Sequence, residues 1–135
     1  MSVTFPTFTM KRTVKEDEID DLNHVNNVVY NKWANDIAVK HWLTVAGDKL
    51  RESVDWVMVK HTLEYKAAAV LGDTIMIKTQ VGKATNATYE RFIEIYNATT
   101  NQLLVRTESV WCAINEHGRP TRISQELKDL FETQS

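Results

Sequence analysis

The sequence predicts a single α+β domain, and three observations support this prediction. Its 135 residues fall within the size range of one domain that can bury a core without disulfides or structural metal. Its 43% hydrophobic and 25% charged residues are typical of a globular chain, and no repeat or linker divides it. One strand, one long helix and four further strands follow in that order, which places the helix against one face of an antiparallel sheet. We therefore expect one domain over residues 1–135.

The first strand and the long helix follow from periodicity. Residues 8–14 alternate loosely between apolar and polar side chains, as a strand does. Residues 27–46 carry apolar side chains at helical spacing and predict a helix about 30 Å long. Asn26 or Asn27 can cap its start, and Gly47 can close its end in the left-handed conformation. We expect this helix to be the central element.

Four β-rich segments follow the helix, with turn residues between them. They comprise residues 55–65, 73–81, 88–96 and 103–114. Because short connections join them, neighbouring strands are expected to be antiparallel. A last amphipathic stretch begins at Ser124, which resembles an N-cap before Glu126, and it predicts a C-terminal helix that docks on the domain.

Charge, hydropathy and cysteine content exclude several classes of protein. A formal net charge of −2 gives no general reason to bind nucleic acid or anionic membranes. No run of about 18 apolar residues is present to span a bilayer, and the N-terminus lacks a basic region followed by an apolar run. Cys112 stands alone, and no Cys/His spacing resembles a zinc site. We expect a cytoplasmic protein with a reduced thiol and no metal.

Polar residues crowd the entrance to the long helix, from Asp20 to Tyr30. One interpretation is capping, because asparagine and aspartate satisfy the free N–H groups of a helix start. The other is an oxyanion site, since those N–H groups and the positive end of the helix dipole favour negative charge. Asp20 could then supply a base or nucleophile against a polarised carbonyl. The acidic run 16–18 just before it is expected to be solvated.

The motif in this segment resembles that of the hotdog-fold acyl thioesterases. Asp20 precedes the stretch His24-Val25-Asn26-Asn27, and Tyr30 and Trp33 follow it. The pattern is similar to that of the 4-hydroxybenzoyl-CoA thioesterase-like family and of the plant acyl-carrier-protein thioesterases. The resemblance covers nearly the whole chain. Its further matches are Glu64-Tyr65, Gly72-Asp73 with Ile75 and Ile77, and residues 115–120.

The resemblance implies a fold and a reaction. The fold is an antiparallel sheet wrapped around one long central helix, with active sites between the subunits of a homodimer or homotetramer. The reaction is hydrolysis of an acyl-CoA or acyl-carrier-protein thioester to acid and thiol, with no cofactor apart from the coenzyme A of the substrate. The first alternative is a non-catalytic acyl-thioester-binding protein on the same fold. A hydratase or dehydratase ranks third, because the spacing of Asp and His typical of those enzymes is missing.

The resemblance also assigns residues. By position, Asp20 matches the catalytic carboxylate, and the backbone N–H of Asn27 matches the donor that holds the thioester oxygen. His24 matches a histidine of the plant enzymes that many bacterial relatives replace with an aliphatic residue. Leu22 stands where the plant pattern has Asn, so the mechanism centred on Asp20 is favoured over the plant version.

Further side chains are candidates for substrate binding. Asn26 either orients the carboxylate of the motif or caps the helix. Tyr30 packs in the core or lines the acyl pocket. Lys60 and Arg91 are candidates to meet the phosphates of coenzyme A, as are Lys83, Arg119 and Arg122. For each of these cations, an ordinary solvated surface charge is the alternative interpretation.

Overall fold

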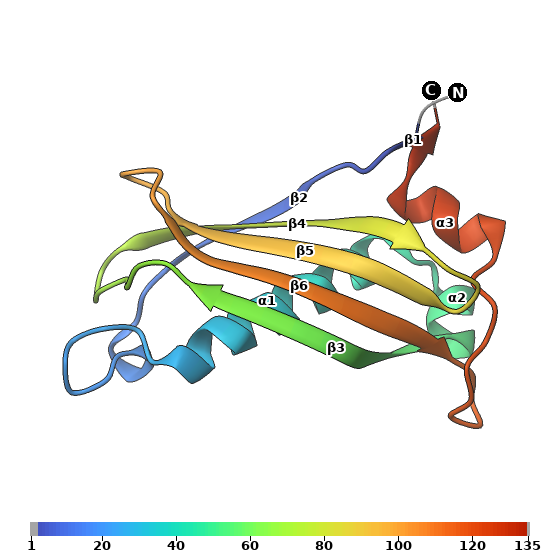
Figure 1. Ribbon diagram of the computed structural model, residues 1–135, viewed down its shortest axis with the longest axis horizontal. Coiled ribbons are helices and arrows are strands. Elements are labelled where there is room, and N and C mark those ends of the chain that lie inside the picture. Colours follow the sequence, from blue (N-terminus) through green and yellow to red (C-terminus); the bar gives the residue numbers. More distant parts are fainter. Residues whose placement is uncertain (1–2, 135) are drawn as a thin grey trace.

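The computed structural model describes residues 3–134, which form a five-stranded sheet with one long helix packed on it (Figure 1). The strands of this sheet are β2 (Phe8–Thr13), β3 (Asp55–Tyr65), β4 (Thr74–Ala84), β5 (Thr88–Asn97) and β6 (Leu103–Ile114). The helices are α1 (Asn27–Val45), α2 (Asp48–Ser53) and α3 (Gln125–Phe131), with a 3₁₀ turn η1 (Glu16–Glu18) before α1. The predicted α+β architecture is confirmed.

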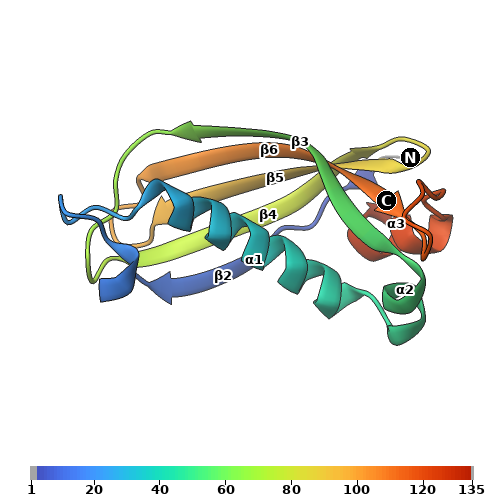
Figure 2. The same cartoon turned by 90° about the horizontal axis from the view of Figure 1, so that it is seen from below.

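The sheet has the strand order β2-β4-β5-β6-β3, and every neighbouring pair is antiparallel. β4, β5 and β6 follow one another as hairpins, whereas β3 crosses to the far edge and pairs with β6. Figure 2 shows α1 running across the face of the sheet, as the resemblance implies. One long edge of β3 therefore has no strand partner among the described residues.

The core lies between α1 and the sheet. Tyr30, Trp33 and Ile37 recur at helical spacing on the inner face of α1, and each is at most 1% exposed. They pack against inward-facing side chains of the sheet, among them Ile75 and Ile95, which are both fully buried. Burial of so much aromatic and aliphatic surface supplies the main driving force of folding. It also fixes the direction in which the N-terminus of α1 points.

The end of α1 differs from the prediction. The sequence predicts that Gly47 closes the helix in the left-handed conformation, but its φ is −78° and its ψ is 169°. The expectation is wrong because a second short helix begins at once, with Gly47 as its N-cap in an extended conformation. The backbone N–H of Ala46 donates to the Trp42 carbonyl at 2.9 Å and completes the last turn of α1 instead.

The C-terminal helix is confirmed. The Ser124 hydroxyl caps α3 by accepting from the Leu127 N–H at 3.1 Å, and Leu127 and Phe131 are buried against the sheet end. A two-stranded antiparallel pair not expected from sequence joins β1 (Val3–Thr4) to β7 (Thr133–Gln134) (Figure 1).

No helix in the described part of the chain combines the length and apolarity needed to cross a membrane.

Candidate active site

The loop before α1 is held in place by backbone pairing at both of its ends. Ile19 and Val25 form an isolated antiparallel bridge, and His24 forms another with Val70. The N–H of Val25 donates to the Ala69 carbonyl at 2.9 Å, and the Val25 side chain is only 2% exposed. The intervening residues are exposed, so the loop presents its polar groups to solvent from a fixed base.

Asp20 is oriented entirely by backbone groups of this loop. Its Oδ1 accepts from the N–H of Leu22 at 2.9 Å and from the N–H of His24 at 3.1 Å. The backbone N–H of Asp20 donates to the His24 carbonyl at 2.8 Å, which closes the loop. Oδ2 has no hydrogen-bond partner within residues 3–134, so one carboxylate oxygen is held in place without a partner there. Since Leu22 contributes its backbone, its side chain does not disturb this arrangement.

The tight loop needs one unusual backbone conformation. Asn23 has a φ of 62°, in the left-handed region that asparagine tolerates better than most residues. Its N–H donates to the Asp20 carbonyl at 3.0 Å. The asparagine at this position therefore serves the shape of the loop.

The first turn of α1 is capped by Asn26 but leaves the backbone N–H of Asn27 open among the described residues. Asn26 Oδ1 accepts from the Val28 N–H at 3.1 Å, and the Asn26 carbonyl accepts from the Val29 N–H at 2.8 Å. The capping interpretation of Asn26 is thus confirmed. The N–H of Asn27 finds no acceptor among the described residues, and it stands at the positive end of a helix of 19 residues. A negative charge placed there accepts a hydrogen bond from the N–H and is stabilised by the helix dipole.

Tyr65 and Tyr30 stabilise the start of α1 through hydrogen bonds of their hydroxyl groups. The Tyr65 hydroxyl donates to the Asn27 carbonyl at 3.1 Å and so ties β3 to α1. The Tyr30 hydroxyl accepts from the Ala69 N–H at 3.0 Å, next to the backbone that holds Val25. Tyr30 is 1% exposed, and burial raises the pKa of its hydroxyl. The core interpretation of Tyr30 is confirmed, whereas direct contact with a substrate stays a prediction.

His24 is exposed beside Asp20, and its backbone groups make the contacts described above. Its imidazole has no hydrogen-bond partner within the part of the chain that the structure describes. The structure therefore brings His24 and Asp20 together through the backbone and leaves the imidazole free. Its catalytic role stays a prediction.

Glu18 is a supporting residue that the sequence analysis missed. The expectation that the acidic run is solvated is wrong for Glu18, because that residue is 8% exposed. Its Oε2 accepts from Arg12 Nη2 at 2.6 Å and from the Trp33 indole at 2.9 Å. Its backbone carbonyl accepts from the Asn26 N–H at 2.9 Å. Glu18 therefore fastens the cap residue of α1 to the core.

The pKa of the Glu18 carboxyl reflects this environment. Burial opposes the charged form, but hydrogen bonds from the Lys15 N–H, Trp33 and Arg12 outweigh burial, and the pKa is lowered. A signal for the contact exists in the sequence: Arg12 shares the inward face of its strand with Phe8 and Met10, so it needs an acidic partner nearby.

The two cations predicted to bind coenzyme A lie in different environments. Lys60 is exposed on β3. Arg91 is 6% exposed, so the interpretation of this residue as a solvated surface charge is wrong. The physical reason is strand alternation, because Arg91 lies on the inward face of β5, the same face as Tyr89, Ile93 and Ile95. The structure does not bring Arg91 to the loop of Asp20.

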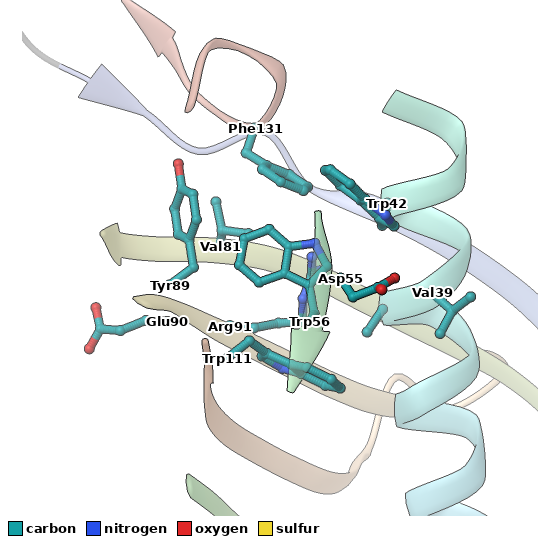
Figure 3. Close-up of a pocket in the computed structure, with 11 residues that line it drawn as sticks. Val39, Trp42, Asp55, Trp56, Val81, Tyr89, Glu90, Arg91, Trp111 and Phe131 are labelled. Carbon is teal, nitrogen blue, oxygen red and sulfur yellow. The ribbon is translucent and has the colours of Figure 1, made fainter. Parts of the chain in front are cut away.

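Arg91 instead lines a pocket at the other end of the domain (Figure 3). This pocket of about 180 Å³ lies between the second half of α1, the sheet and α3. Its walls are mostly apolar, with the aromatic residues Trp42, Trp56, Trp111 and Phe131 among them. Val39 lines the pocket, and Asn27 stands at the start of α1. The two residues are twelve positions apart on this helix, which corresponds to about 18 Å. The helix start and the pocket are therefore separate sites within one chain.

Comparison with known proteins places the chain in a family. The family model of the thioesterase-like superfamily matches residues 14–131. The chain belongs to this superfamily. The family resemblance read from the motif is thereby confirmed, whereas a search among curated proteins gives no match.

Solved structures support the same fold. A 1,4-dihydroxy-2-naphthoyl-CoA thioesterase from Synechocystis has a TM-score of 0.81 and 17% identity over 93% of this chain and 96% of its own. A Staphylococcus aureus protein in complex with CoA has a TM-score of 0.83 and 18% identity over 93% and 82%. A 12:0-ACP thioesterase from Umbellularia californica has a TM-score of 0.79 and 16% identity over 91% and 48%. These likenesses confirm the hotdog fold.

Proposed function

We propose that the protein hydrolyses an acyl thioester of coenzyme A or of an acyl carrier protein to a free acid and a thiol. One observation carries the proposal. A carboxylate with one free oxygen, Asp20, is locked by its own loop directly before a long helix whose first N–H, that of Asn27, is open. Membership of the thioesterase-like superfamily supports the same chemistry.

Each group has a defined part in the reaction. The Asn27 N–H and the helix dipole stabilise the oxyanion that forms when the thioester carbonyl is attacked. In one route, Asp20 accepts a proton from water while the water oxygen bonds to the carbonyl carbon. In the other, Asp20 attacks and forms an anhydride that water then hydrolyses. In both routes the carbon–sulfur bond breaks and the thiolate leaves, and we propose that His24 assists proton transfer.

The function is tested by thiol release from short-chain, long-chain and aryl acyl-CoAs. We expect release from at least one class, and the preferred class defines the acyl group. Binding of acyl-CoA without release from any CoA or carrier-protein thioester would favour the non-catalytic alternative instead.

We further propose that two copies of the chain associate through β3. Its outer edge is unpaired in the described structure, and Val57, Met58 and Val59 on it are 45%, 37% and 58% exposed. An open apolar edge strand is a template for pairing with another strand. Antiparallel pairing about the middle of β3 places Asp55 of one copy opposite the partner subunit's Tyr65. The aromatic pocket of one copy then lies near the helix start of the other.

The association predicts the effect of a charge on this edge. Val59→Lys is expected to shift the protein from a dimer toward a monomer of 15.5 kDa, because the lysine charge disfavours burial at the interface. Light scattering after size exclusion measures the mass. Leu71→Lys is the matched control, since Leu71 is also exposed (46%) but lies outside β3. A wild-type monomer at all concentrations, or an unchanged Val59→Lys dimer, contradicts the proposal.

Lys60 lies on the same exposed edge strand and stays our candidate for contact with the coenzyme A phosphates. The Michaelis constant of acyl-CoA should then rise with salt, because screening weakens exposed charge pairs.

A further inference from the structure

Arg91 is a buried cation whose guanidinium is fixed at one nitrogen. Its Nη1 donates to Thr79 Oγ1 at 2.8 Å and to His41 Nδ1 at 3.0 Å. His41 is itself held between the rings of Phe8 and Phe131, with centroid distances of 4.9 and 5.0 Å. Burial and the neighbouring Arg91 charge lower the pKa of His41 to about 4, so at neutral pH its Nδ1 is a neutral acceptor. The orientation of the guanidinium is therefore set before any ligand arrives.

The other two nitrogens of Arg91 are unsatisfied. Nε and Nη2 have no acceptor within residues 3–134. Neither atom is completely shielded from solvent. These adjacent N–H groups form the parallel pair that receives a carboxylate with two hydrogen bonds. No carboxylate of the described residues lies within 4.0 Å of the guanidinium. A buried cation without a counter-ion is costly, which is a reason for an anionic ligand.

The charge persists under ordinary conditions. Burial lowers the pKa of Arg91 to about 10, which still leaves the guanidinium protonated at neutral pH. Two carboxylates, Glu90 and Asp55, also line the pocket. Glu90 Oε1 accepts from the Lys83 N–H at 2.8 Å, and its side chain points away from the other lining residues (Figure 3). Asp55 is exposed at the start of β3.

The space in front of Arg91 fits an apolar body with a charged end. Figure 3 shows the Arg91 side chain extending from β5 toward the centre of the pocket, beside Trp56 and Trp111. Phe131 covers the guanidinium at 5.7 Å from its ring centroid. Aromatic walls bury an aliphatic chain or stack on a ring, whereas the fork of Nε and Nη2 specifies the end group.

We propose that this pocket binds an organic group that ends in a carboxylate, received side-on by Nε and Nη2 of Arg91. If the proposed hydrolysis holds, the preferred substrates are thioesters whose acyl group carries a second, distal carboxylate. That extension rests on the proposed function, whereas carboxylate binding does not. The acyl group reaches the pocket across the β3 edge from the other copy, because the chains tested below are shorter than the distance of about 18 Å along α1.

Binding is tested on the wild-type protein with benzoate and benzamide, which have nearly the same shape and differ in charge. Trp42, Trp56 and Trp111 line the pocket, so tryptophan fluorescence reports occupancy, and calorimetry gives the dissociation constant. We expect benzoate to bind at least about tenfold more tightly than benzamide. Arg91→Met should remove this difference, and Arg91→Lys, which keeps the charge but not the fork, should reduce it. Circular dichroism checks that both variants fold.

Thiol release from adipoyl-CoA and hexanoyl-CoA, and from their twelve-carbon counterparts, tests the extension. We expect kcat/KM at least about tenfold higher for a diacid thioester than for its monoacid counterpart of the same length. Equal binding of benzoate and benzamide, or binding of neither at millimolar concentration, overturns the carboxylate site. Tight benzoate binding with no thiol release from any thioester leaves that site standing and rejects the proposed hydrolysis.

Discussion

Asp20→Asn is expected to lower kcat for thioester hydrolysis by about 100-fold or more, with little change in the fold. The amide oxygen of asparagine can still accept from the N–H groups of Leu22 and His24, so the loop keeps its closing bonds. The substitution removes the negative charge, and with it the capacity to take a proton from water or to attack the thioester carbon. Kinetics on the preferred acyl-CoA, with a thermal melt of each variant, measures the two effects separately.

Asp21→Asn provides the matched control. Asp21 is the next residue, is also exposed, and makes no hydrogen bond within the described chain. Both substitutions remove one negative charge from the same loop, so any general effect of net charge on coenzyme A binding appears in both. We expect Asp21→Asn to keep wild-type turnover. Wild-type kcat in Asp20→Asn, or an equal loss in both variants, would contradict a chemical part for Asp20.

The fold could be read from the sequence because its main signals are local. Helical spacing of Trp33 and Ile37 and the alternation within the strands specify which face of each element is buried. The confirmed caps at Asn26 and Ser124 are likewise short-range contacts. The left-handed conformation expected at Gly47 is wrong because the conformation of that glycine depends on the start of α2, the next element of the chain.

The site was predictable to a smaller extent. The motif predicts that Asp20 lies beside the helix start, but the donors that orient its carboxylate are backbone groups, whose geometry has no residue signature. Arg12 and Arg91 each share a strand face with apolar residues, which signals burial of their charge. Their partners, Glu18 and His41, lie on other elements of the chain. Only the tertiary arrangement brings such pairs together.

The second large effect is expected at Glu18. Glu18→Ala should lower the free energy of unfolding by about 3 kcal/mol, because removal of one partner of a buried ion pair leaves the other without compensation. The Arg12 side chain is only 21% exposed, and the Trp33 indole, which is fully buried, also loses its acceptor. Urea denaturation followed by circular dichroism measures the change. Glu16→Ala, in the same turn but exposed, is expected to change stability by less than about 0.5 kcal/mol.

The pH dependence of this effect has a defined sign. The pKa of Glu18 is lower in the folded protein than its ordinary value of 4.5, so folding favours the ionised carboxylate. Its contribution is therefore fully present above pH about 4.5 and is lost as the pH falls through the folded pKa. Glu18→Gln keeps the size of the side chain but cannot ionise, so the stability difference from wild type should be largest near neutral pH and shrink in acid. A difference that stays constant between pH 7 and 3 would show that Glu18 stabilises the start of α1 by packing and neutral hydrogen bonds, with no part for its charge.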